Sequence, residues 1–340
     1  MKITTSDFGL GSQLFTIENK KGMRIAFTNY GARIVDWVVE GKHIVLGFDC
    51  AQEYQEKDIF PGATVGRIAG RTKDGLVVIN GQSVQLEQND FPQAIHGGSN
   101  PSQAQIWQAQ TFQKEEEAGV EYTLRLKDGE GGYPGNLDFT TIHTFNEAGE
   151  WKIEYRAVSD KDTVFNPTGH VYFNLNGEAD QPIDNHELQI AASRYVPLLD
   201  QSQVVRGDLV EVTGTPFDFR APQTLSEVFS SSDPQIRLVD GLDHGFLLDE
   251  CNLAKEQARL TLGKLSVSTY TDQPSVVIFT ANFGDMGTVY RGKPEAHHGG
   301  ITFETQVAPG SPQIPELGDI TLNTGETYQA TTIYKVNLGE

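Results

Sequence analysis

The feature that most constrains the fold is an alternation of apolar and polar residues with a period of two, which recurs along most of the chain. Between Trp151 and Ala157, apolar residues alternate with charged ones, a pattern typical of a half-buried antiparallel strand. Similar patterns occur at residues 23–29, 33–39, 138–145, 258–262, 275–280 and 328–336. We therefore expect strands to make up most of the fold.

Short turns separate these segments, at Tyr30-Gly31, Asn80-Gly81, Glu147-Ala148-Gly149 and Asn323-Thr324-Gly325. The 35 glycines and 15 prolines suit a protein of many strands and turns, and a helical bundle would not tolerate them. The best helix candidate, residues 222–229, is short. The predicted fold class is therefore all-β, with packed antiparallel sheets and few helices. No long linker interrupts the 340 residues, so we expect one domain spanning 1–340.

Composition limits the possible partners and cofactors. A formal net charge of -20, without runs of Lys or Arg, argues against nucleic acid and anionic lipid and favours a neutral small molecule. No segment resembles a secretion signal or a membrane span, so a cytoplasmic location is expected. Cys50 and Cys251 lie in no CxxC pattern and are expected to be free thiols. The adjacent His297 and His298 would point to opposite faces of a strand, so no metal site is expected.

Several short polar motifs, far apart in the sequence, supply an imidazole, a carboxylate and groups able to bind hydroxyls. They are Gly66-Arg67-Ile68-Ala69-Gly70-Arg71, His96-Gly97-Gly98, residues 166–175 (Asn-Pro-Thr-Gly-His-Val-Tyr-Phe-Asn-Leu), Leu242-Asp243-His244 and Phe303-Glu304-Thr305-Gln306. Together they point to acid/base chemistry on a sugar.

Each motif also has a purely structural interpretation. His170 could be a hydrogen-bonded core histidine, and the glycines after His96 indicate a close approach of the backbone to another group. Asp243 could simply orient a turn. Glu304 lies in an apolar strand, on the same face as Thr302. A carboxylate there needs a partner or a function, unless the strand is at a sheet edge with that face in solvent.

The combination, order and spacing of these motifs resemble those of the aldose 1-epimerase (galactose mutarotase) family over essentially the whole chain. The resemblance implies a large antiparallel β-sandwich of the galactose mutarotase type, an open cleft, a hexose substrate and no cofactor. Carried over by motif, His170 would be the general acid and Glu304 the general base. Arg71, His96 and Asp243 would bind the sugar.

Further contacts and departures follow from the same motifs. Tyr172 and Phe279 are expected to add aromatic contacts with the sugar. Of the two arginines four residues apart, Arg67 and Arg71, the motif favours Arg71 as the ligand-binding one, and the other could form a structural ion pair. Four residues differ from those common in the family and affect secondary hydroxyl contacts: Gly70 (often Asn), Gly169 and Val171 (often Asn and Ser) and Val277 (Gln in some relatives).

The expected chemistry is general acid/base opening of a pyranose. Ionised Glu304 would remove the proton of the C1 hydroxyl while protonated His170 donates one to the ring oxygen O5. After rotation about the bond from C1 to C2, the reverse steps would close the ring as the other anomer.

Other functions stay open at this stage. They are a hexose-6-phosphate 1-epimerase of the same fold, a glycoside hydrolase that uses Asp243 and Glu304, and a non-catalytic sugar-binding module that uses Tyr172 and Phe279. His170 favours an epimerase, because neither hydrolysis by a carboxylate pair nor simple binding requires an imidazole acid.

Overall fold

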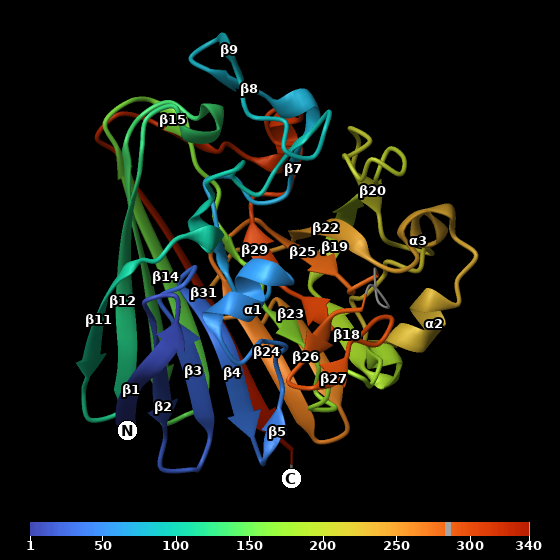
Figure 1. Cartoon of the computed structure of the whole chain (residues 1–340). Helices are drawn as coiled ribbons and strands as arrows, with labels where there is room; N and C mark the ends of the chain where they lie inside the picture. Colours follow the sequence, from blue (N-terminus) through green and yellow to red (C-terminus); the bar gives the residue numbers. More distant parts are fainter. Residues whose placement is uncertain (283–286, 340) are drawn as a thin grey trace.

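The computed structural model describes residues 1–282 and 287–339, in which most regular structure is strand (Figure 1). One layer is a nine-stranded antiparallel sheet. Its order is β11 (Gln108–Gln113), β12 (Glu117–Leu126), β13 (Leu137–Asn146), β14 (Glu150–Ser159), β31 (Thr327–Leu338), β24 (Leu265–Thr271), β23 (Ala258–Leu262), β18 (Glu187–Ile190) and β21 (Gln223–Thr224).

Two five-stranded sheets cover this layer. The first runs in chain order through β1 (Lys2–Gly9), β2 (Ser12–Glu18), β3 (Arg24–Thr28), β4 (Arg33–Val39) and β5 (Lys42–His43). The second has the order β20 (Val210–Glu211), β19 (Ala192–Val196), β22 (Asp243–Leu248), β25 (Ser275–Phe279) and β29 (Glu304–Gln306). The predicted antiparallel sandwich is confirmed.

Short two-stranded pairings complete the fold. They join β6 (Thr64–Val65) to β16 (Thr168–Gly169), β7 (Arg71–Thr72) to β10 (Ala94–Ile95), β8 (Leu76–Ile79) to β9 (Gln82–Gln85), β15 (Thr163–Val164) to β30 (Thr321–Leu322), β17 (Tyr172–Phe173) to β28 (Ile301–Thr302), and β26 (Val289–Tyr290) to β27 (Lys293–Pro294). In Figure 1, β7, β22, β25 and β29 lie in the upper half of the molecule, whereas both termini lie at its lower end.

Apolar side chains from the facing sheets form the core. The alternation in β14 is confirmed, because Trp151 and Tyr155 are buried while the charged residues between them point outward. Trp37 of β4 packs edge-on against Trp151 and against Phe145 of β13, with ring centroids 6.0 Å apart in both pairs. The same core cluster continues under β19, β22 and β25 through residues such as Phe246. Both halves of the sandwich therefore share one hydrophobic core.

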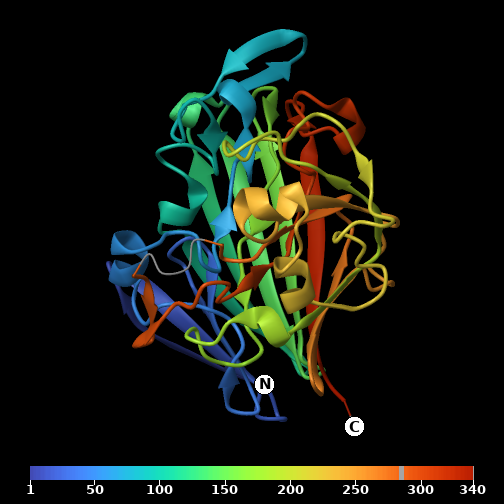
Figure 2. The ribbon, with the colours of Figure 1, turned by 90° about the vertical axis from the view of Figure 1, so that its right-hand side faces the viewer.

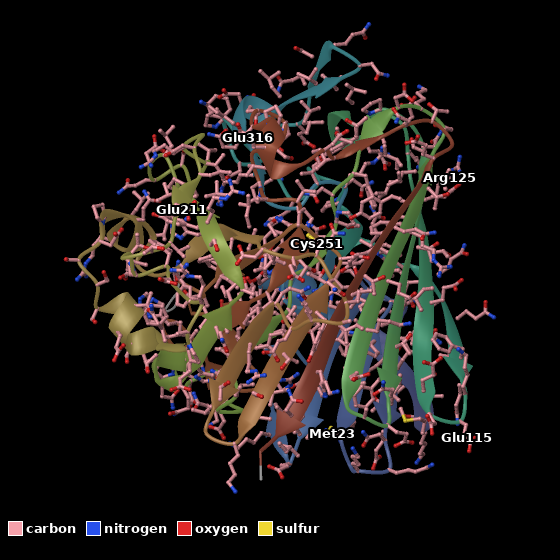
Figure 3. All side chains as sticks on the ribbon, turned by 180° about the vertical axis from the view of Figure 1, so that it is seen from behind. Met23, Glu115, Arg125, Glu211, Cys251 and Glu316 are labelled. Carbon is pink, nitrogen blue, oxygen red and sulfur yellow. The ribbon has the colours of Figure 1, made fainter. Side chains whose placement is uncertain are left out.

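All seven predicted strand segments are strands, with boundaries within two residues of those expected. The Asn80-Gly81 turn joins β8 and β9 with positive φ at both residues, 51° and 75°, as a tight hairpin requires. Seen from behind, Glu115 lies at the tip of the hairpin between β11 and β12 (Figure 3). Cys50 and Cys251 are free thiols.

The helix prediction was partly wrong. Helix α2 spans Leu225–Phe229, because Gln223 and Thr224 instead pair with β18 as strand β21. The prediction also missed α1 (Ala51–Glu56) and α3 (Pro234–Val239), which are too short to show a helical repeat. Helices α2 and α3 lie together at one side of the sandwich, facing the viewer in Figure 2. In the described part of the chain, no helix has the length and hydrophobicity that crossing a membrane requires.

Candidate active site

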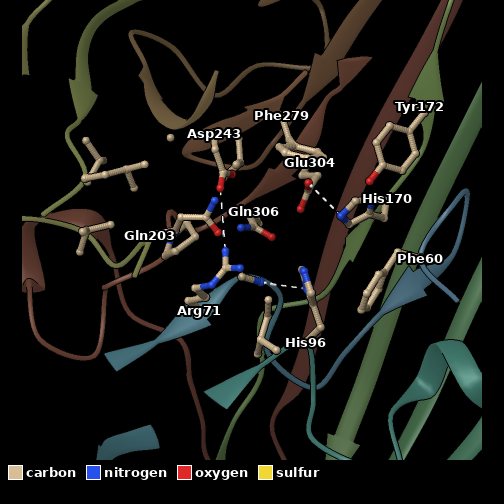
Figure 4. A pocket seen from close by; sticks show the side chains of 18 of the residues that line it. Phe60, Arg71, His96, His170, Tyr172, Gln203, Asp243, Phe279, Glu304 and Gln306 are labelled. Atoms are coloured by element: carbon tan, nitrogen blue, oxygen red, sulfur yellow. Dashed lines mark hydrogen bonds and ion pairs between the residues drawn. The ribbon is translucent and has the colours of Figure 1, made fainter. Parts of the chain in front are cut away.

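A cavity of about 400 Å³ opens where the second five-stranded sheet meets the short strands β7, β10 and β17. Every candidate sugar-site residue chosen from the motifs lines it (Figure 4): Arg71, His96, His170, Tyr172, Asp243, Phe279 and Glu304. Strand register brings several of them together, because Asp243 pairs with Phe279 across the sheet and Glu304 pairs with Val277.

Glu304 is a buried carboxyl group on an edge strand. Strand β29 is the last strand of its sheet, yet Glu304 is only 4% exposed, so the alternative of a solvated face is wrong. Thr302 lies on the same face as predicted, and its Oγ1 donates a hydrogen bond of 3.2 Å to Glu304 Oε1. Burial raises the pKa of Glu304 to about 8, although the Thr302 hydrogen bond and Arg71 lower it.

His170 faces Glu304 directly. It follows strand β16, is 5% exposed, and its Nε2 lies 3.4 Å from Glu304 Oε1. Burial lowers the pKa of His170 to about 4, against the raising effect of Asp58 and Asp243. Between these two pKa values the pair holds one proton, which belongs to both groups together. His170 is therefore placed to exchange a proton rather than only to fill the core.

His96 presents a neutral hydrogen-bond donor. The Gly70 N–H donates to His96 Nδ1 over 3.2 Å, and burial lowers the pKa of His96 well below its usual value. The imidazole is then neutral with its proton on Nε2. A Cβ atom at Gly97 would lie 2.0 Å from the Gly66 carbonyl oxygen. The predicted close approach of the backbone at Gly97 is confirmed, and the group it approaches is the Gly66 carbonyl.

The two arginines have different surroundings. Arg71 lines the cavity, donates from Nε to Asp90 Oδ2 over 2.8 Å, and its Nη1 lies 3.8 Å from Asp243 Oδ2. Arg67 is buried outside that cavity and donates to the carbonyl oxygens of Lys127, Pro134 and Gly135. Arg67 is therefore structural, with backbone partners where an ion pair was considered, and Arg71 is the arginine that faces the cavity.

Asp243 begins strand β22 and points into the cavity beside Arg71. Burial raises its pKa to about 6, opposed by the charge of Arg71. Its side chain faces the cavity from the first position of a strand, so the interpretation of Asp243 as a turn residue is wrong. The cavity thus combines an acid/base pair with a guanidinium, an imidazole donor and a second carboxyl group.

Comparison with known proteins decides the family. The sequence profile of the family described as aldose 1-epimerase matches residues 13–335. The aldose 1-epimerase of Escherichia coli (strain K12) is 33% identical over 334 residues, covering 95% of this chain and 94% of that protein. The galactose mutarotase of Rattus norvegicus is 35% identical over 300 residues, covering 87% and 84%.

The chain belongs to the aldose 1-epimerase family. The solved structure of galactose 1-epimerase from Lactobacillus acidophilus NCFM superposes with a TM-score of 0.91 at 32% identity, covering 100% of both chains. An aldose epimerase homologue from C. elegans, at 23% identity, shares the fold with a TM-score of 0.87.

The four departures from common aldose 1-epimerase residues divide into two groups. A Cβ atom at Gly169 would meet the Tyr155 hydroxyl at 3.2 Å, and Val171 belongs to the hydrophobic core. Neither of these two positions lines the cavity. Gly70 and Val277 line the cavity and do change its wall.

Several cavity residues were missed from the sequence. Asp58, Phe60 and Gln203 lie outside regular strands and carry no recognisable pattern. The Phe60 ring centroid lies 4.9 Å from that of His96. Gln306 could have been found, because it is part of the Phe-Glu-Thr-Gln motif and shares a strand face with Glu304.

The reasoning about His297 and His298 was wrong. They lie in a turn, not on a strand, with ring centroids 4.0 Å apart, and both contact Asp240. Within residues 1–282 and 287–339, no three His, Cys, Asp or Glu side chains are grouped so that they could hold a metal ion.

Proposed function

We propose that this protein interconverts the α and β anomers of D-galactose and related aldohexoses by opening and reclosing the pyranose ring. The proposal rests on the contact of His170 Nε2 with Glu304 Oε1, 3.4 Å apart and both buried in a sugar-sized cavity. Membership of a family of isomerases that act on the anomeric carbon supports it.

Ring opening moves two protons and breaks one bond. Glu304 takes the proton of the C1 hydroxyl, and the electrons of that O–H bond form the carbonyl at C1. The bond from C1 to O5 breaks, and O5 keeps its electrons and receives the proton of His170. After rotation about the bond from C1 to C2, neutral His170 takes back the O5 proton and protonated Glu304 returns its proton to the C1 oxygen.

The resting pair already contains the proton that the reaction needs. In the empty cavity burial favours neutral Glu304 and neutral His170, whereas ring opening needs an ionised carboxylate and an imidazolium. The two forms differ only in which group holds one proton. A C1 hydroxyl donating to Glu304 stabilises the carboxylate, so sugar binding shifts this proton to His170 across the 3.4 Å contact.

The remaining polar groups hold the ring. Arg71 and the Nε2–H of His96 donate to sugar oxygens, and Asp243 accepts from hydroxyls. Tyr172 and Phe279 provide apolar walls that keep the ring aligned with both catalytic groups.

The alternatives fit the cavity less well. Among the described lining residues, the cationic side chains are Lys57 and Arg71, and both already contact carboxylates: Lys57 that of Glu53, and Arg71 those of Asp90 and Asp243. This balance disfavours the dianion of a hexose 6-phosphate. A hydrolase would pair Asp243 with Glu304, but Asp243 contacts Arg71 while Glu304 faces an imidazole. A simple binding module needs no such pair.

Polarimetry on freshly dissolved α-D-galactose tests the proposal. We expect the protein to accelerate the approach to anomeric equilibrium, and Glu304→Gln to abolish nearly all of that acceleration because an amide cannot accept the proton. Circular dichroism checks that the variant is folded. Release of phenol from an aryl galactoside, with no effect on galactose, would instead identify a hydrolase.

A further inference from the structure

Gln306 is a polar cavity residue that has no role in the mechanism above. Gln306 is fully buried and lines the cavity, yet neither its Oε1 nor its Nε2 has a hydrogen-bond partner among the described residues. Buried amides are almost always paired, because water no longer satisfies them. An unpaired amide at the wall of a binding cavity indicates a polar group of the ligand.

The position of Gln306 is fixed relative to Glu304, the residue proposed to act at C1 of the sugar. Side chains two residues apart on a strand share a face, so Gln306 faces the cavity with Glu304. A rise of about 3.3 Å per residue separates them by about 6.6 Å along β29. That spacing resembles the distance between the C1 and C4 hydroxyls on opposite sides of a pyranose.

Gln306 forms part of the cavity wall beside Gly70 and Glu304. In Figure 4 it lies between Glu304 and Arg71. A Cβ atom at Gly70 would lie 3.6 Å from Gln306 Nε2, at ordinary van der Waals distance, so the amide faces the same part of the cavity wall as Gly70.

A hydrogen bond to a sugar hydroxyl is more favourable at Gln306 than at the charged residues beside it. Arg71 is already bonded to Asp90 at 2.8 Å and lies 3.8 Å from Asp243, so a sugar must share or replace these contacts. At Gln306 no protein hydrogen bond among the described residues has to break. The full benefit of satisfying a buried donor and acceptor then goes to the ligand.

We propose that Gln306 is the specificity-determining residue that binds the C4 hydroxyl of the aldohexose, donating from Nε2 and accepting at Oε1. This assignment rests on the proposed function, which places the C1 hydroxyl at Glu304. An amide binds a hydroxyl through both its donor and its acceptor, so the site discriminates against a sugar that lacks the group.

The test compares D-galactose with 4-deoxy-D-galactose in the wild type, in Gln306→Met and in Thr305→Val. Methionine is similar in size but cannot form these hydrogen bonds. Thr305 is the matched control, because it is the adjacent residue of β29, does not line the cavity and hydrogen-bonds to Thr332. The measured quantity is kcat/KM for anomer interconversion.

We expect the wild type and Thr305→Val to lose about tenfold in kcat/KM when the C4 hydroxyl is removed, as for one good hydrogen bond. Gln306→Met should lose about tenfold on galactose and show no further loss on the 4-deoxy sugar. A 4-deoxy penalty in Gln306→Met equal to that of the wild type would overturn the assignment.

Thermal unfolding without sugar gives an independent readout. Gln306→Met should melt at the same or a higher temperature than the wild type, because no hydrogen bond to any described residue is lost. Thr305→Val should melt lower. A lower melting temperature for Gln306→Met would mean that the amide is bonded within the protein and would overturn the inference.

Measurements on the wild type alone distinguish failure of the proposed function from failure of the Gln306 assignment. If it fails to accelerate galactose mutarotation, the proposed function is wrong. If it accelerates the reaction but uses 4-deoxy-D-galactose equally well, only the assignment of Gln306 is wrong. 3-Deoxy-D-galactose tests which hydroxyl Gln306 contacts. A loss of kcat/KM with that sugar alone, again absent in Gln306→Met, would place the contact at C3 and refute contact at C4.

Discussion

Glu304 and His170 hold one proton over a wide pH range, because burial moves their pKa values in opposite directions, to about 8 and about 4. In the proposed mechanism, ring opening uses that proton on the imidazole, and ring closure uses it on the carboxyl group. Each half of the reaction therefore prepares the pair for the other half.

This proton count predicts a bell-shaped pH dependence of kcat/KM. Below about pH 4 both groups are protonated and the base is lost, whereas above about pH 8 both are deprotonated and the acid is lost. Asp243 takes up a proton near pH 6, which weakens its hold on hydroxyls and adds an earlier step on the acid side. Measured profiles should show that Asp243→Asn removes only this earlier step, and a flat profile from pH 4 to 10 would contradict the shared proton.

We predict that His170→Asn lowers kcat by about 10²–10⁴-fold and changes KM little, because an acid acts mainly in the transition state. His186→Asn is a suitable control, since His186 is also buried but lies outside the cavity and accepts from the Leu175 N–H. The control should lose stability and keep its kcat. An unchanged kcat in His170→Asn would show that another group supplies the acid.

At the scale of single elements, the loop that carries His96 depends on backbone contacts that only glycine permits. Gly97 has φ of 90°, and its Cα lies against the Gly66 carbonyl so closely that a Cβ would be 2.0 Å from the oxygen. The imidazole is also held by the Gly70 N–H. The position of the donor is therefore set by the path of two neighbouring loops.

Gly97→Ala should displace this loop. We expect the free energy of unfolding to fall by about 1–3 kcal/mol, which lowers the melting temperature. We also expect kcat/KM to fall, because His96 moves. The control is Gly81→Ala, where φ is 75° but no atom lies within 4 Å of the added Cβ. It should be destabilised less and keep full activity. Equal effects of both changes on kcat/KM would show that contact with Gly66 does not position His96.

The strands were predictable because their physical signals are local, whereas the candidate site residues were chosen because each stands in a short motif that resembles the aldose 1-epimerase family. The alternation around Trp151 and the Asn80-Gly81 turn are each visible in a few adjacent residues. Short helices such as α3 were not, since their start depends on one cap, Asp233, which accepts from the Gln235 N–H. Asp58 and Phe60 reach the cavity only because the chain folds back there, and no local pattern records that.

At the scale of the whole molecule, one continuous core joins the half of the sandwich under β1–β5 to the half under the cavity. Such a shared core favours cooperative unfolding, and we propose that residues 1–340 unfold as one domain. Trp37, Trp107 and Trp151 all lie in this core. Heating or urea should therefore reduce tryptophan burial and activity along coincident curves. Loss of activity well before the fluorescence change would indicate that the cavity half unfolds separately.

The proposed acid and base also reach the cavity from distant parts of the chain, with His170 near its middle and Glu304 close to its end. A nascent polypeptide on the ribosome cannot assemble the catalytic pair until β29 has emerged. A chain divided in an exposed turn between these residues would leave one proton carrier on each fragment. Reassociation of the fragments would then be reported by the return of mutarotation.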